Sequence, residues 1–135
     1  MGIELRRRRD LKLGQTISFA NAALIADVGA LEGGDGAGPS PHDLYDAALG
    51  ACKALTVLWY AARKHIPVDD IAVRVDRDDS QERSGTYALT ATLRVSGALT
   101  DAQLQELHAV AEKCPIHKLM TSVTTTIHTD VERAT

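Results

Sequence analysis

The stretch that decides the fold is PSPHDLYDAALGACKALTVLWYAARKHIP, residues 39–67 of a chain of 135 residues. Ser40 is a preferred N-cap, Pro41 suits the first helical position, and Asp43 places a negative charge in the first turn. At the other end, Pro67 disfavours helical geometry at the residue that precedes it. The sequence therefore predicts one long helix over residues 41–65.

The apolar residues of this helix recur every three or four positions, which is typical of a helix with one buried face. The predicted stripe consists of Leu44, Ala48, Cys52, Leu55, Trp59 and Ala62. Cys52 is therefore expected to face the core. Lys53, Arg63 and Lys64 lie off this stripe.

Shorter elements are predicted on both sides of the helix. Three weakly alternating segments, 3–13, 16–20 and 23–27, predict a meander of strands, and the alternating segments 71–77 and 87–95 predict a hairpin. The capping-box pattern of Thr100 and Gln103 begins a helix that runs to about Lys113. Pro115 begins a short helix, and the Thr- and Val-rich residues 123–131 predict a last strand. This order indicates a single α+β domain over residues 1–135.

The glycine-rich residues 29–39 are interpreted as a flexible connector. The cluster GDGAG at residues 34–38 has some likeness to a phosphate-binding loop. However, Pro39 and Pro41 remove backbone donors where an anion would bind. A lone glycine cluster is also a weak signal for phosphate, so the connector is the favoured interpretation.

The composition argues against several classes of protein. A net charge of −3 disfavours nucleic-acid binding, and the isolated basic run at residues 6–9 is interpreted as a solvated edge strand. There is no 18-residue apolar run and no apolar signal region near residue 1, so we expect a cytoplasmic protein that binds no membrane. Only 4% of the residues are aromatic. Such a small core is often completed by a partner chain, which favours an oligomer.

The two cysteines, Cys52 and Cys114, lie in different predicted helices. In a reducing compartment a permanent disulfide is disfavoured, which raises the odds of a catalytic or sensing role. Cys114 precedes Pro115 at a helix N-cap, and His117 and Lys118 follow within one turn, so the residues alone favour Cys114 as the more acidic thiol. Cys52 is expected to be an inert core residue unless a cation reaches it.

The same segment has part of a metal-site pattern, because Cys114-x-x-His117 has the spacing of half a zinc site. His42, His108 and His128 are further possible ligands. The sequence has no second closely spaced pair of ligands, so neither a metal nor another cofactor is expected.

Three segments carry a resemblance to a known family: GPSPHDL at 38–44, AALGAC at 47–52 and CPIHKL at 114–119. They resemble the OsmC/Ohr family (osmotically inducible protein C-like, organic hydroperoxide resistance) of thiol-dependent peroxidases. The resemblance implies an OsmC-like fold, in which antiparallel sheets wrap a long central helix in an intertwined homodimer. It also implies active sites at the dimer interface.

The same resemblance implies a role for each thiol. Cys52 would attack an organic hydroperoxide and become a sulfenic acid, and Cys114 would resolve it as a Cys52–Cys114 disulfide that an external dithiol reduces. This order reverses the ranking of the thiols from residues alone.

Three residues are expected to support this chemistry: His42, Asp43 and His117. The chain departs from the family at His42, which stands where peroxidase members have a glutamate that steadies an arginine. Asp43 is the nearest carboxylate, and the sequence leaves open which of Arg6 to Arg9, if any, matches the family's arginine. The alternative function is a non-catalytic or redox-sensing OsmC-like protein that binds a small apolar ligand at the dimer cleft.

Overall fold

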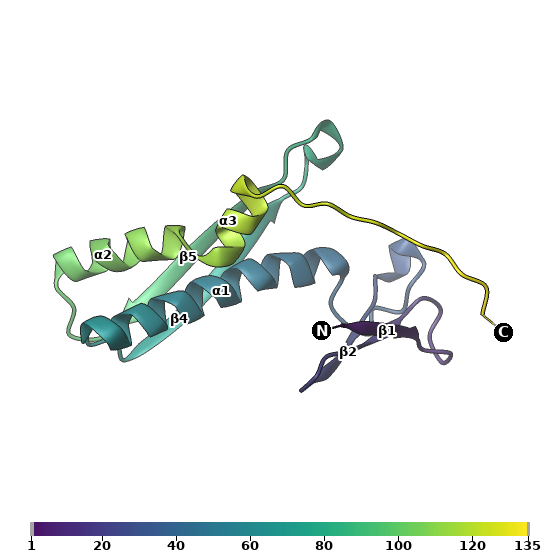
Figure 1. Cartoon of the computed structure of the whole chain (residues 1–135), viewed down its shortest axis with the longest axis horizontal. Helices are drawn as coiled ribbons and strands as arrows, with labels where there is room; N and C mark the ends of the chain where they lie inside the picture. Colours follow the sequence, from purple (N-terminus) through teal and green to yellow (C-terminus); the bar gives the residue numbers. More distant parts are fainter. Residues whose placement is uncertain (1, 135) are drawn as a thin grey trace. The chain divides into compact units, whose positions relative to one another are not determined.

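The structure is a computed structural model that describes residues 2–134, and it is a mixed α+β fold with antiparallel sheets and a long helix (Figure 1). The chain divides into two compact units. The first contains the residues up to Gly50 together with Arg74–Thr92, and the second contains Ala51–Val73 together with the residues from Leu93 onward. The single domain expected from the length stays a prediction.

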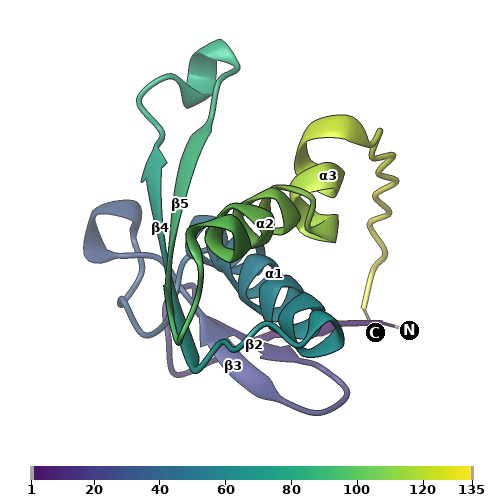
Figure 2. The ribbon, with the colours of Figure 1, turned by 90° about the vertical axis from the view of Figure 1, so that its left-hand side faces the viewer.

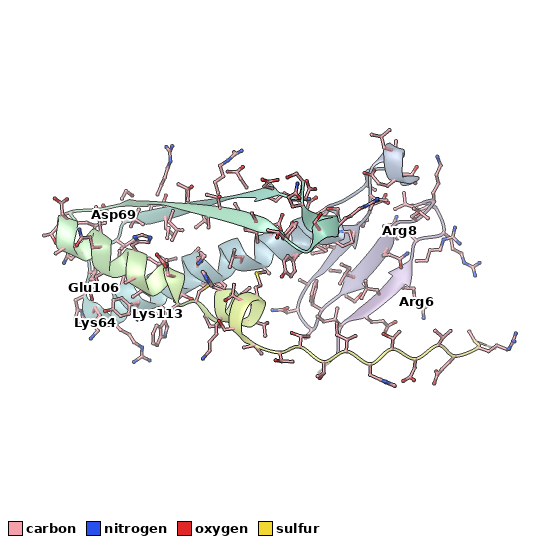
Figure 3. All side chains as sticks on the ribbon, turned by 90° about the horizontal axis from the view of Figure 1, so that it is seen from above. Arg6, Arg8, Lys64, Asp69, Glu106 and Lys113 are labelled. Atoms are coloured by element: carbon pink, nitrogen blue, oxygen red, sulfur yellow. The ribbon has the colours of Figure 1, made fainter. Side chains whose placement is uncertain are left out.

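The first unit begins with the predicted meander. Strands β1 (Glu4–Arg7), β2 (Gln15–Ser18) and β3 (Ala23–Ala26) form an antiparallel sheet in that order. β1 is shorter than predicted because the chain turns at Arg8, whose amide donates to the Gly14 carbonyl at 2.8 Å. All four β1 residues are exposed, which confirms a solvated edge strand for its two arginines. Figure 3 labels Arg6 and Arg8 on this strand and the turn after it.

The glycine-rich connector is tied down by the buried side chain of Asp27. Its carboxylate accepts hydrogen bonds from the amides of Val28 at 2.8 Å, Ala37 at 3.1 Å and Asp35 at 3.3 Å. These amides, Val28 first, lower the pKa of Asp27 below its ordinary value. A Cβ at Gly34 would lie 2.2 Å from the Val28 carbonyl oxygen, so only glycine fits there. The connector therefore has a specific hydrogen-bonded geometry, unlike the flexible segment that its composition indicates.

Helix α1 (Pro41–Lys64) ends within one residue of its predicted bounds. Its start is a reciprocal cap: the Ser40 hydroxyl accepts from the Asp43 amide at 3.1 Å, and the Asp43 carboxylate accepts from the Ser40 amide at 2.9 Å. A second anchor lies one turn further along, where Tyr87 donates its hydroxyl hydrogen to the buried Asp46 carboxylate at 2.6 Å. The first turns of α1 are thus fixed within the first unit.

The core of the second unit surrounds the last turns of α1. Helix α2 (Asp101–Glu112) lies alongside that part of α1 (Figure 2). The buried residues of this cluster are Val57, Ala61, Ile66, Leu107 and Ala111. α2 begins with the predicted capping box, in which Thr100 accepts from the Gln103 amide at 3.1 Å and Gln103 accepts from the Thr100 amide at 3.0 Å.

The predicted apolar stripe of α1 is wrong in the second unit. The buried positions are Lys53, Val57 and Ala61, spaced by four, whereas Leu55 is 67% exposed and Trp59 is 59% exposed. The helix is apolar on more than one face, and periodicity does not tell which face its own chain covers. The consequence is that a lysine occupies a core position and a tryptophan does not.

The remaining elements confirm the hairpin and the short helix but not the last strand. β4 (Asp70–Asp78) and β5 (Ala88–Ser96) form a two-stranded sheet, and α3 (Pro115–Ser122) follows α2. The strand predicted over residues 123–131 is absent: residues 123–134 have no regular structure and are exposed. β propensity forms no strand without a neighbour to pair with, and none is present in the described chain. Within residues 2–134, no helix has the length and apolarity to cross a bilayer.

One substitution in the core of the second unit should lower the stability of the fold. Leu107 is 3% exposed, so Leu107→Ala should lower the free energy of unfolding by about 2–5 kcal/mol through lost burial and a cavity. Leu31 is fully exposed and provides the matched control, because Leu31→Ala removes the same atoms without a cavity. Urea unfolding with an unchanged m value measures both. Equal losses in the two variants would contradict this position of the core.

The anchor at Tyr87 predicts a loss of stability in alkali. Burial, followed by the hydrogen bond to Asp46, raises the pKa of Tyr87 to about 12. An unfolded tyrosine has a pKa of about 10, so this stabilising contribution is complete below pH 10 and is lost as the pH rises toward 12. Tyr87→Phe should be less stable at neutral pH and should flatten the fall in urea midpoint over that range. An equally steep fall in Tyr87→Phe would exclude Tyr87 as its cause.

Candidate functional site

The structure brings Cys52 and Cys114 together at the start of α3. The sulfur of Cys52, on α1, accepts a hydrogen bond from the Ile116 amide at 3.4 Å. Cys114 is the N-cap of the same helix, two residues before Ile116, and its side chain is completely buried. Both thiols are free. Two cysteines that are far apart in the sequence therefore meet within one unit.

The local sequence explains why the Ile116 amide is available to a thiol. The first amides of a helix have no partner in the helix itself. Cys114 has an extended backbone, and Pro115 provides no amide hydrogen, so Ile116 has the first free amide of α3. Cys52 accepts this hydrogen bond with its sulfur. The helix N-terminus thus favours negative charge on Cys52 as well as on the cysteine that caps it.

The N-cap position does not make Cys114 an acidic thiol. Burial raises the pKa of Cys114 above its ordinary value, although the His117 amide and the positive charge of Lys53 act in the opposite direction. The sequence showed the N-cap position but not the complete burial of the side chain. Cys52 is only half-buried, and the Thr56 hydroxyl lies 4.0 Å from its sulfur.

Lys53 is the residue of this site that the sequence analysis missed. Its side chain is 6% exposed, and its ammonium donates to the Ala111 carbonyl at 2.8 Å and to Nδ1 of His117 at 3.0 Å. An ammonium has donors only, so Nδ1 of His117 accepts in this pair. The sequence did contain a signal that Lys53 is buried, because it lies four and eight residues before the core positions Val57 and Ala61. Lysine is rarely fully buried, however, so the spacing alone did not indicate it.

His117 therefore belongs to the thiol site, whereas His42 and Asp43 lie in a separate cluster of the first unit. Nε2 of His42 is 2.9 Å from a carboxylate oxygen of Glu82. Asp43 pairs with Arg77 of β4, and the pKa of Asp43 is lowered by the Ser40 amide first and then by Arg77. Arg77 also pairs with Asp46 at 2.7 Å.

Both helix carboxylates thus pair with Arg77, a residue that the sequence did not single out. Arg6 and Arg8 pair instead with Glu4 and Asp10, near them in sequence. A hollow of about 360 Å³ adjoins the cluster. Its lining is largely aromatic and consists of Pro41, His42, Tyr45, Glu82 and Tyr87.

The histidines weighed as metal ligands have other partners. His108 pairs with Glu112 at 3.0 Å, and His128 pairs with Asp130 at 3.1 Å. Among the residues described, no three His, Cys, Asp or Glu side chains are arranged to hold a metal ion. The thiol site is built from two thiols, a lysine and an imidazole.

Comparison with known proteins places the chain in a family. A family model described as OsmC-like protein matches residues 33–129. An OsmC like protein from Mycoplasma pneumoniae is 17% identical, with a TM-score of 0.72 over 90% of this chain and 87% of that chain. No curated protein matches the chain.

Two further solved structures have the same fold. An organic hydroperoxide resistance protein OsmC from Legionella pneumophila is 17% identical, with a TM-score of 0.67 over 90% of both chains. The organic hydroperoxide resistance protein OhrB of Bacillus subtilis is 24% identical, with a TM-score of 0.59 over 90% of both chains. At such identities the likeness is one of fold. With its family match over residues 33–129, the chain belongs to the OsmC-like protein family.

Proposed function

We propose that this protein is a thiol-dependent peroxidase that reduces organic hydroperoxides. One observation carries the proposal: the half-buried sulfur of Cys52 accepts a helix-terminal amide from the turn that Cys114 begins. A thiol that accepts such an amide is favoured as a thiolate, and a second thiol nearby can close a disulfide. Two of the structural relatives are named organic hydroperoxide resistance proteins.

The proposed chemistry has two steps on this chain. The Cys52 thiolate attacks one peroxide oxygen, the O–O bond breaks, and the alcohol leaves with a proton, so Cys52 becomes a sulfenic acid. The Cys114 thiolate then attacks the Cys52 sulfur, the S–O bond breaks, and the oxygen leaves as water. The two thiols lose two electrons and the peroxide gains them. An external dithiol restores both thiols by exchange.

Exposed apolar side chains near the thiols in the same unit support an organic substrate and a partner chain. Leu55, Leu58 and Trp59 of α1 and Leu119 of α3 are each more than 40% exposed. Apolar surface of this kind is often covered by another molecule. We propose that a second copy of the chain covers it, so that the protein acts as a homodimer.

A second candidate function is supported by the hollow at the start of α1. Its aromatic lining suits a small apolar ligand, and His42 is neutral or cationic where peroxidase members of the family have a glutamate. In this reading the two cysteines form a reversible disulfide without turnover. Catalytic consumption of hydroperoxide separates the two functions.

The peroxidase proposal predicts turnover with cumene hydroperoxide and a dithiol reductant. Cys52→Ser should abolish consumption of the peroxide, because it removes the attacking sulfur. Oxidation of the unaltered protein by one equivalent of peroxide should give a Cys52–Cys114 crosslink in the mass spectrum, with the loss of two hydrogens. Cys114→Ser should instead accumulate sulfenic or sulfinic acid at Cys52. Disulfide formation without turnover would favour the sensing function, and an unreactive Cys52 would exclude both.

The dimer proposal predicts a mass of twice 14.5 kDa by light scattering at micromolar concentration. Trp59→Glu should shift the protein toward the monomer, because it places a charge on the exposed apolar face of α1. Leu31→Glu is the matched control, since Leu31 is fully exposed in a different segment. A monomeric unaltered protein would contradict the dimer.

A further inference from the structure

Lys53 is a buried cation without a carboxylate partner in the described part of the chain. Its ammonium is held by two neutral acceptors, the Ala111 carbonyl and the His117 imidazole. The nearest acidic residues of α2 have other partners: Glu106 accepts from Tyr60, and Glu112 pairs with His108. A buried ammonium is costly unless an anion balances it.

The groups that face Lys53 indicate which anion could balance the charge of its ammonium. From α2 it meets a backbone carbonyl, and from α3 it meets the His117 ring. Cys52 precedes it on α1, and Cys114 caps the helix that carries His117. The thiols are the groups here that become anionic during redox chemistry. Of the two, Cys114 is completely buried and so has no water to stabilise its negative charge.

We propose that Lys53 is a positioning residue of the thiol pair, whose fixed positive charge favours ionisation of the buried Cys114 and so speeds disulfide closure. Ala111 and His117 hold the ammonium in place, and His117 does so only while its Nδ1 is unprotonated. The effect on closure rests on the proposed peroxidase function. The effect on ionisation does not.

The charge acts on one step of the proposed reaction. Cys114 loses its thiol proton, its sulfur forms a bond to the Cys52 sulfenic sulfur, and the S–O bond breaks. The departing hydroxide takes up a proton and becomes water. The hydroperoxide of the preceding step is the oxidant. Lys53 keeps its protons throughout and stabilises the thiolate.

A purely structural role for Lys53 has to be distinguished from this one. The Ala111 carbonyl lies in the last turn of α2, where carbonyls lack helical partners, so Lys53 also caps α2. Two substitutions separate the roles. Lys53→Gln retains an N–H donor for the two acceptors but has no charge. Lys53→Met has neither the donor nor the charge.

The decisive measurement is the ionisation of Cys114 in a Cys52→Ser background, followed by the ultraviolet absorbance of the thiolate. The variant that also carries Cys114→Ser provides the blank. Both Lys53→Gln and Lys53→Met should raise the midpoint by about one pH unit or more, because a nearby cation is lost. Lys113→Met removes an exposed lysine next to Cys114 in sequence and should leave the midpoint unchanged.

Two outcomes of the titration overturn the proposal. The first is a midpoint that stays in place in both Lys53 variants. The second is a midpoint that moves in Lys53→Met but not in Lys53→Gln, which would assign Lys53 to capping alone. Thermal melting and circular dichroism identify a variant that does not fold, and the other variant then decides the test.

Rapid-quench kinetics with cumene hydroperoxide test the consequence for closure. In Lys53→Gln the Cys52–Cys114 disulfide should form about three- to tenfold more slowly after sulfenic acid formation. The two steps are resolved by trapping the sulfenic acid with dimedone. If the disulfide forms at an unchanged rate although the ionisation midpoint of Cys114 is raised, Lys53 does not speed closure. If the unaltered protein consumes no peroxide, the proposed function fails while the titration still decides whether Lys53 favours ionisation of Cys114.

Discussion

The hydrogen bond from the Ile116 amide to the Cys52 sulfur is the contact around which the second unit is arranged. It requires α3 to begin against α1, and this depends on the turn that follows α2. Cys114 is buried in that turn, and Ile116, two residues later, provides the amide. Lys53 joins the same three helices, because it bonds to the end of α2 and to His117 of α3. A helix terminus, a cysteine and a lysine thus fix one another.

Local signals made much of the fold predictable. Ser40 and Pro41 defined the start of α1, and Thr100 with Gln103 defined the start of α2, because a cap is an interaction between residues adjacent in sequence. The failures were nonlocal. Leu55 and Trp59 have the spacing of a buried stripe, yet the chain covers the neighbouring face. Residues 123–131 have the composition of a strand but no strand beside them. Periodicity describes an element, whereas burial and pairing depend on what lies next to it.

The candidate site was also predictable only where its signals are local in the sequence. The two cysteines were recognisable because thiols are scarce and one of them precedes a proline. Lys53 was not, since a lysine between apolar residues is ordinarily a solvated one. Arg77 was missed for a related reason: nothing in its own strand indicates that it pairs with Asp43 and Asp46. Two effects oppose each other at Cys114, because a helix terminus favours the thiolate and complete burial disfavours it more.

Asp27 gives the first unit a sensitivity to acid. Its carboxylate accepts three amides of the glycine-rich segment, and its own amide donates to the Pro39 carbonyl at 3.0 Å, just before α1 begins. The pKa of Asp27 is lowered in the fold, so its stabilising contribution is complete above the pKa of an unfolded aspartate. As the pH falls through the folded pKa, a protonated carboxyl becomes a poorer acceptor for these amides. Acidification would then loosen the link between the meander and the helix start.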